Sequence, residues 1–133
     1  MDYHNYGCPI RFAAGVLGDR WSLVILRDLM FKNRKYYGDF LSAGEGISTN
    51  ILANRLLKLE TESVIQKTLD PDHGKRYIYS LTDKGVALLP VLLSMMEWAA
   101  EFDDQTEMPK KFIKKLQEDP ESLSAEVLAH LHS

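Results

Sequence analysis

Cysteine is almost absent from this chain of 133 residues, in which Cys8 stands alone. A single cysteine excludes an intrachain disulfide and a thiolate zinc site. The histidines are scattered, and His130 and His132 are two residues apart, a spacing that does not place both on one helical face. We therefore expect neither a metal site nor a cofactor.

Long apolar runs and a secretory leader are also missing. The most apolar stretch, residues 86–96, is interrupted by Pro90 and Ser94 and falls short of the length that spans a membrane. The N-terminal sequence MDYHNYGCPI carries an early acid, two tyrosines and a histidine, unlike a secretory signal. These absences predict a cytoplasmic protein without a membrane partner.

Motifs that mark an enzyme are lacking as well. The sequence has no glycine-rich phosphate loop and no paired-carboxylate site. A nucleophilic role for Cys8 would need a histidine at a diagnostic spacing, and His4 is the only histidine near it. We expect the protein not to be an enzyme.

Charge is unevenly distributed along the chain, whose total net charge is −3. Residues 1–84 carry 12 Lys/Arg and 10 Asp/Glu, a net charge of +2, whereas residues 85–133 carry 4 and 9, a net charge of −5. Nucleic-acid affinity depends on basic groups gathered on one face rather than on the total. The split permits DNA binding by the N-terminal part.

The first part of the chain predicts three helices. Pro9 suits the first turn of a helix that ends at Gly18, and Asp19 is a favourable N-cap for a second helix, RWSLVILRDLMF. Apolar side chains recur in that helix at steps of three and four, the pattern of a core-facing stripe. A basic connection, residues 32–35, leads to a short third helix over residues 37–42.

A fourth helix follows a turn that contains two glycines. Ser48 is its predicted N-cap, and the helix extends to about Glu62. One sector of the helix is apolar, and the opposite sector consists of small, almost uncharged side chains, whereas a solvated face usually carries Glu and Lys. The inward positions are Ile51, Leu52, Leu56 and Leu59, and the outward ones are Thr49, Asn50, Ala53, Asn54 and Leu57.

A hairpin and further helices complete the predicted fold. Strands over residues 64–69 and 77–81 flank a charged reversal, DPDHGKR. Thr82 or Asp83 then caps a fifth helix that reaches about Ala100. The order predicts a mainly helical α+β protein with a small β-hairpin wing, a winged helix-turn-helix.

Two parts are predicted along the chain. Residues 1–101 would form the DNA-binding domain, with dimerisation elements in its first and fifth helices. Residues 102–133 would form an acidic linker and two short helices, KKFIKKLQ and ESLSAEVLAHLH, too short to fold alone. We expect this tail to pack against a partner or against its own domain.

The ordered motifs CPI, LGDRWSLVILRDL, YGDF, GISTNILANRLLKLE and YSLTDKG, followed by LLPVL and Trp98, resemble the HxlR-type branch of winged helix-turn-helix regulators, relatives of the MarR-like repressors. The resemblance covers residues 8–98. It implies a homodimer that binds double-stranded DNA. Leu57, Ser63 and Lys67 depart from the residues frequent in the family, and the departures bear on the preferred DNA sequence.

The outer face of the fourth helix suits base recognition in the major groove. Asn pairs with adenine, Thr bonds either type of base, and Ala contacts the thymine methyl group. We therefore predict base contacts from Thr49, Asn50, Ala53 and Asn54, with Ser48 at a phosphate. A solvated helix without a partner is the alternative.

Basic residues around this helix are predicted to contact the DNA backbone or the minor groove. For Arg55 two roles stay open, a phosphate contact or an anchor that holds the helix to its neighbours. Asp70 and Asp72 would oppose a close approach of the wing to phosphates, and the alternative for both the wing tip and the basic loop is a merely solvated surface. The predicted phosphate ligands are Lys32, Arg34 and Lys35, and the predicted wing contacts are Lys75 and Arg76, with Arg76 placed in the minor groove by the resemblance.

Cys8 precedes the first helix, where backbone N–H groups favour a thiolate. The resemblance implies a sensor of oxidants or electrophiles at this place, and the alternative is an inert thiol. The leading prediction of function is a homodimeric, sequence-specific regulator of transcription, mostly a repressor. The alternative is a winged-helix interaction module that has lost specific DNA binding.

Overall fold

The computed structural model describes residues 7–132, so most of the segment examined for a leader lies outside the described residues. The chain forms two compact units, of which one ends at Gly85 and the other begins at Val86. The first contains α1 (Pro9–Leu17), α2 (Arg20–Phe31), α3 (Tyr37–Leu41), α4 (Thr49–Thr61), β1 (Ile65–Asp70) and β2 (His73–Leu81). The boundary between the units falls at the last residue of α5 (Asp83–Val86). The predicted fold class, mainly helical with a two-stranded antiparallel hairpin, is confirmed.

The core of the first unit forms where α2 packs on α4 and α4 packs on β1. The predicted inward residues Leu52, Leu56 and Leu59 of α4 are buried, whereas Ile51, also predicted to face inward, is half-buried. The buried apolar residues of these elements are Ile25, Leu26, Leu29, Met30, Leu52, Leu56, Leu59 and Ile65. This core fixes α4 and leaves its opposite face exposed.

The predicted N-caps of α2 and α4 are confirmed. Asp19 Oδ1 accepts a hydrogen bond from the backbone N of Trp21 at 3.3 Å, and Ser48 Oγ accepts one from the N of Ile51 at 3.2 Å. Each side chain satisfies a backbone donor that the first turn of a helix leaves without a partner. The starts of both helices are therefore set locally by the sequence.

The hairpin is longer than the sequence pattern predicts. Asp70 pairs with His73, so the turn contains only Pro71 and Asp72, and the second strand begins at His73 rather than at Tyr77. The residues at the start of β2 are exposed and polar. Among the first four residues of β2 only His73 has a partner in β1, and a register shift separates this pair from the pair Leu69–Tyr77. The side-chain pattern could not reveal this extension.

The predicted fifth helix is two helices, α5 and α6 (Leu89–Phe102). Thr82, one of the two predicted caps, accepts a hydrogen bond from the N of Gly85 on its Oγ1 at 3.1 Å. Pro90 lies in the first turn of α6, where its missing N–H costs nothing, and its ring cannot continue a preceding helix. Pro90, which the sequence analysis treats as an interruption of an apolar stretch, therefore marks the start of α6.

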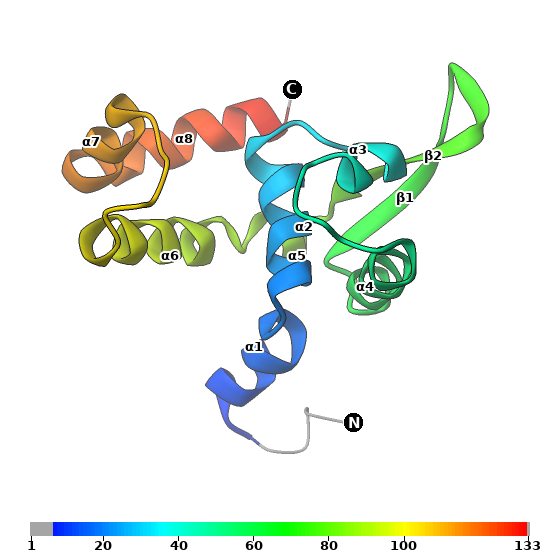
Figure 1. Ribbon diagram of the computed structural model, residues 1–133, viewed down its shortest axis with the longest axis horizontal. Helices are drawn as coiled ribbons and strands as arrows, with labels where there is room; N and C mark the ends of the chain where they lie inside the picture. The colour runs from blue at the N-terminus through cyan, green and yellow to red at the C-terminus, as the bar shows by residue number, and fades with distance from the viewer. Residues whose placement is uncertain (1–6, 133) are drawn as a thin grey trace. The chain divides into compact units, whose positions relative to one another are not determined.

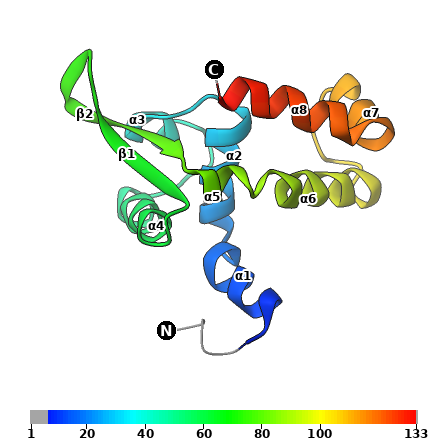
Figure 2. The ribbon, with the colours of Figure 1, turned by 180° about the vertical axis from the view of Figure 1, so that it is seen from behind.

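The second unit consists of α6, α7 (Lys110–Glu118) and α8 (Pro120–Leu131). Because α6 extends to Phe102, the linker begins later than predicted. α7 packs against both α6 and α8, and both figures show α7 and α8 beside α6 (Figures 1 and 2). Leu116 and Leu123 are buried there. The C-terminal tail thus packs against its own chain.

The expectation that no stretch reaches membrane-spanning length needs correction. The stretch Asp83–Phe102 is 20 residues long and, by length and composition alone, apolar enough to cross a membrane. The sequence argument ended at residue 96 and omitted Trp98, Ala99, Ala100 and Phe102. Core helices of soluble proteins pass the same test, so this feature is weak evidence of a membrane span.

Candidate nucleic-acid interface

The outer face of α4 presents the predicted base-reading residues together. Thr49, Asn50, Ala53 and Asn54 are all exposed, while Leu52, Leu56 and Leu59 on the other side are buried. Ser48 is exposed as well, although its hydroxyl caps the helix. Leu57 continues the face with 62% of its surface exposed. This recognition face offers short hydroxyl, amide and methyl groups to a partner.

Two features position the start of α4. The Tyr37 hydroxyl donates a hydrogen bond to the carbonyl O of Thr49 at 3.1 Å and so joins α3 to α4. The connecting turn contains Gly44 and Gly46 at φ values of 83° and 77°, a conformation that L side chains rarely adopt. The predicted turn is confirmed, and α3, turn and α4 form the helix-turn-helix (Figure 1).

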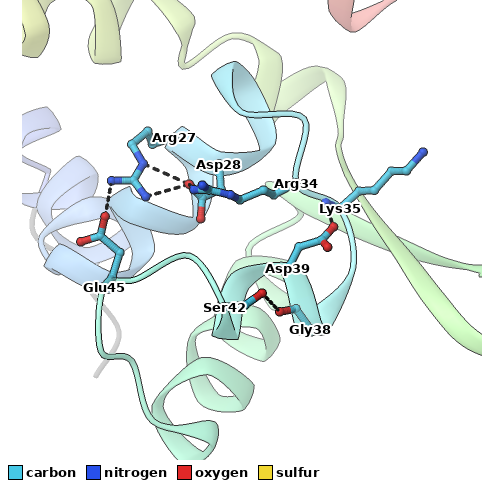
Figure 3. A network of polar contacts seen from close by, with 8 residues as sticks. All are labelled: Arg27, Asp28, Arg34, Lys35, Gly38, Asp39, Ser42 and Glu45. Carbon is cyan, nitrogen blue, oxygen red and sulfur yellow. Dashed lines mark hydrogen bonds and ion pairs between the residues drawn. The ribbon is translucent and has the colours of Figure 1, made fainter. Parts of the chain in front are cut away.

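A buried carboxylate that the sequence analysis did not single out holds the loops around this motif. Asp28 is 1% exposed, and its Oδ1 accepts hydrogen bonds from Arg27 at 2.8 and 3.0 Å and from Arg34 at 2.8 Å. Arg27 also donates to Glu45 at 2.7 Å, so α2 is tied to the glycine turn (Figure 3). The signal in the sequence is a carboxylate in the apolar stripe of α2.

The electrostatics of Arg27 follow from this position. Burial opposes its charge, but the hydrogen bonds and charges of Asp28 and Glu45 outweigh burial and raise the pKa of the guanidinium above its ordinary value. Arg27 therefore stays charged and fixed. Its role is structural support of the helix-turn-helix.

The three predicted phosphate ligands between α2 and α3 differ in how they are held. Lys32 and Lys35 are exposed, and in Figure 3 the Lys35 side chain extends away from the network of polar contacts. The backbone of Lys35 is fixed, since its carbonyl accepts a hydrogen bond from the N of Tyr79 at 2.8 Å. Arg34 instead pairs with Asp28. The lysines are thus the more available cations.

Arg55 pairs with the side chain of Asp19, the N-cap of α2. Burial raises the pKa of the Asp19 carboxyl, but the hydrogen bonds from Arg55 and Trp21 lower it below its ordinary value. Arg55 Nη1 also donates to Asn54 Oδ1 at 2.7 Å. Of the two roles predicted for Arg55, this geometry supports the anchoring one, because it joins α4 to the start of α2.

One wing cation, Arg76, is held by a second buried carboxylate. Asp70 is 3% exposed, and its Oδ2 accepts hydrogen bonds from Arg76 Nε at 2.8 Å and from the Tyr36 hydroxyl at 3.2 Å. The Arg76 guanidinium lies 3.8 Å from the centre of the Tyr36 ring. Hydrogen bonds from the Asp72 backbone and from Arg76 lower the pKa of the Asp70 carboxyl. Asp70 is therefore a structural partner of Arg76 rather than an exposed repulsive charge.

The remaining wing residues lie in the open. Lys75 is exposed, and Arg76 keeps 49% of its side chain exposed despite its pairing. Both line a hollow between α3 and β2, together with Tyr36, Tyr37, Gly38, Asp39, Tyr77 and Tyr79. The structure thus places both predicted wing cations at an accessible surface of the first unit.

Cys8 is exposed at the N-cap position of α1. Its backbone carbonyl accepts a hydrogen bond from the N of Phe12 at 3.0 Å, and Pro9 occupies the first turn. The side chain makes no capping hydrogen bond. The thiol is open to reagents in solution.

The second unit exposes an apolar face on α6. Val91, Met95, Trp98 and Phe102 are 41%, 46%, 67% and 68% exposed, at steps of four, three and four residues. Such steps place side chains on one side of a helix. The Trp98 and Phe102 rings lie 5.6 Å apart, and a shallow groove runs along Val91, Met95 and Trp98.

Comparison with known proteins identifies the family. A family model described as HxlR-like helix-turn-helix matches residues 16–107, a span that does not include Cys8. The HTH-type transcriptional regulator sll1512 of Synechocystis sp. is 37% identical over 98 residues, which are 74% of this chain and 72% of the relative. The HTH-type transcriptional regulator YodB of Bacillus subtilis is 34% identical over 99 residues, 74% of this chain and 88% of YodB.

Solved structures agree with this assignment. The structure of the transcription factor candidate PA1607 matches with a TM-score of 0.73 at 32% identity, over 81% of this chain and 76% of that one. The reduced form of YodB matches with a TM-score of 0.60 at 31% identity over 75% and 98%, and the redox regulator HypR in its oxidised form with 0.65 at 26% identity over 73% and 99%. With the winged helix-turn-helix geometry, these matches show that the chain belongs to the HxlR-like helix-turn-helix family of transcriptional regulators.

Proposed function

We propose that this regulator binds double-stranded DNA in a sequence-specific manner as a homodimer, with α4 in the major groove and the wing at the minor groove. The observation that carries the proposal is the recognition face of α4, where exposed Asn50 and Asn54 stand beside Ala53 above a rigidly packed core. Short amides and methyl groups reach base edges without steric conflict. We assign no enzymatic activity to the chain and expect it to act in the cytoplasm without a membrane partner.

Cations around the recognition face supply the contacts that position a duplex. Lys32, Lys35 and Lys75 are exposed, and basic side chains that meet phosphates set the register of a protein on DNA. Ser48 and the N-terminus of α4 present backbone N–H groups to the same end. Arg34, Arg55 and Arg76 are held by carboxylates, so we expect them to stabilise the interface geometry first and to contact DNA second.

The homodimer rests on the apolar face of α6. A row of four exposed large apolar side chains on one helix face is typical of an interaction surface. A second copy of the chain supplies an identical face, which suits an isologous two-fold contact. Two recognition helices about one DNA turn apart would then read two half-sites. Repression by occupying a promoter is the simplest consequence.

The test is a selection from random duplex DNA with the purified, reduced protein at physiological salt. We expect a two-fold-symmetric site with half-sites about ten base pairs apart. Enrichment of no motif by a folded protein would contradict the proposal and favour the alternative, an interaction module without specific DNA binding. Such a module would bind DNA only in a salt-sensitive, non-specific way.

A second proposal concerns Cys8. The thiol is exposed at the start of α1, and the matched YodB has been solved in reduced, diamide-treated and quinone-bound forms. We propose that oxidants or electrophiles modify Cys8 and lower DNA affinity, with any disulfide formed to another molecule. Diamide should weaken binding of the selected duplex by the wild type and leave the Cys8→Ser variant unchanged. Equal loss in both proteins, or none in either, would contradict it.

A further inference from the structure

The two asparagines on the recognition face differ in how their amides are held. Asn54 Oδ1 accepts a hydrogen bond from Arg55 Nη1 at 2.7 Å. The Asn50 amide makes no hydrogen bond to another side chain among the described residues. Both side chains are exposed. One amide is therefore oriented by the protein, and the other is free to turn.

Arg55 is itself fixed, so the orientation does not depend on a mobile side chain. Its Nε donates to Asp19 Oδ2, and Asp19 is held in turn by the Trp21 backbone and by the buried Ser22 hydroxyl, each at 3.3 Å. A guanidinium presents its donors in a rigid planar fork, so fixing Nε also fixes Nη1. Asp19, Arg55 and Asn54 form a chain of contacts from the core to the recognition face, which we call the orienting relay.

The chemical consequence follows from the two ends of the amide. An asparagine reads adenine by accepting from N6 and donating to N7 at once. An amide oxygen has two lone pairs, so Oδ1 keeps one of them, but the Arg55 guanidinium places a positive charge beside it that disfavours a further donor. The Asn54 amide is therefore biased toward donating through Nδ2. Donors suit guanine O6 and N7, adenine N7 or thymine O4, whereas cytosine presents a donor in the major groove.

We infer that the orienting relay makes Asn54 a donor-biased reader, which disfavours cytosine at one base of each half-site, while Asn50 remains able to pair bidentately with adenine. Arg55 is the positioning residue of this device, since it acts on DNA through Asn54. The inference rests on the proposed DNA binding and adds the specificity of one position to it.

The test is a position-resolved base-preference profile, measured by competition among duplexes that differ at single base pairs of the selected site. Asn54→Asp keeps an oxygen toward Arg55 and replaces the Nδ2 donor by a second carboxylate oxygen, which is an acceptor. We expect its preference at one base pair per half-site to move toward cytosine by about tenfold. The matched control, Asn50→Asp, should alter a different base pair.

Removing the orienting relay should weaken base discrimination only at the base pair that Asn54 contacts. Arg55→Met releases the Asn54 amide, so discrimination at that base pair should fall by about tenfold, with adenine gaining, while preferences elsewhere stay as in the wild type. Asp19→Asn keeps an N-cap and should produce a smaller loss at the same base pair. Thermal unfolding of each variant shows whether it is folded under the assay conditions.

The possible outcomes distinguish a failure of the orienting relay from a failure of the proposed DNA binding. If the wild type selects a motif but Arg55→Met and Asp19→Asn leave the profile unchanged, or weaken all positions equally, the orienting relay is wrong and specific DNA binding stands. If the wild type selects no motif at all, both fail. An Asn54→Asp profile identical to that of the wild type also overturns the relay.

Discussion

The two units of this regulator present surfaces of different chemistry. In the described part of the first unit, arginines pair with carboxylates at Asp19, Asp28 and Asp70, and these pairs fix the loops and helix that carry the polar recognition face. The second unit instead leaves Trp98 and Phe102 of α6 in the open. Directional polar contacts suit a partner read by geometry, whereas apolar area suits a partner recognised by burial. The two proposed partners, a duplex and a second copy of the chain, differ in chemistry in the same way.

The largest expected effect tests the apolar face. Trp98→Glu places a charge where Trp98 would be buried in a dimer, so we expect the dimer dissociation constant to rise about 100-fold or more, as at an interface hot spot. Sedimentation equilibrium measures it. Leu57→Glu, an equally drastic change on the recognition face, should leave the dimer intact and weaken DNA binding. If Trp98→Glu dimerises as tightly as the wild type and Leu57→Glu do, the apolar face of α6 is not the dimer interface.

The next effect concerns the ionic framework of the first unit. Asp28→Ala leaves Arg27 and Arg34 without their buried acceptor, and because both arginines stay about one-third exposed we expect a loss of roughly 2–3 kcal/mol in the free energy of unfolding. Urea denaturation measures the loss. Asp72→Ala, at the exposed tip of the wing, should change stability by less than about 0.5 kcal/mol. Similar values for the two variants would refute a structural role for Asp28.

The pH dependence of stability sharpens the same point. The folded state lowers the pKa of Asp19 below its ordinary value of 3.8, so the ionised carboxylate stabilises the fold above that pH. As pH falls through 3.8 and then through the lower folded pKa, this contribution is lost. Wild type should therefore exceed Asp19→Asn in unfolding free energy at pH 7, and the gap should narrow below about pH 4. A gap that stays constant with pH would show that the charge on Asp19 contributes nothing.

The smallest effect concerns backbone strain between α4 and β1. Ser63 has a φ of 60°, a left-handed conformation that costs most L residues roughly 1–2 kcal/mol. Ser63→Gly should therefore raise the unfolding free energy by about 1 kcal/mol. Ser42→Gly is the matched control, because Ser42 has a φ of −90° and gains nothing from glycine. Stabilisation of both variants, or of neither, would argue against strain at Ser63.

Local signals explain what the sequence could predict. Asp19 and Ser48 predict the starts of α2 and α4 because an N-cap residue hydrogen-bonds to the first turn of its own helix. The spacing of apolar residues along both helices predicts which side of each helix faces the core. The outward residues of α4 follow from the same periodicity. The fold class and the composition of the recognition face were thus accessible without a structure.

Contacts between distant residues could not be predicted in the same way. The pairs Arg55–Asp19 and Arg27–Glu45 join residues 36 and 18 positions apart, and Asp70 becomes buried only when Arg76 and Tyr36 meet it. The start of β2 is marked by the single pair Asp70–His73, which exposed polar side chains do not reveal. The basic residues of the candidate interface could therefore be predicted from the sequence, but the carboxylate partners of three of its arginines could not.

The most direct test of the account compares two affinities of one variant. Fluorescence anisotropy would measure binding of the selected duplex and of a scrambled duplex of equal length by wild type and Asn50→Ala. We predict that Asn50→Ala weakens binding of the selected duplex about tenfold and leaves the scrambled duplex unaffected, since a base contact carries specificity and phosphate contacts do not. An equal effect on both duplexes, or wild-type affinities that do not differ between them, would contradict sequence reading by α4.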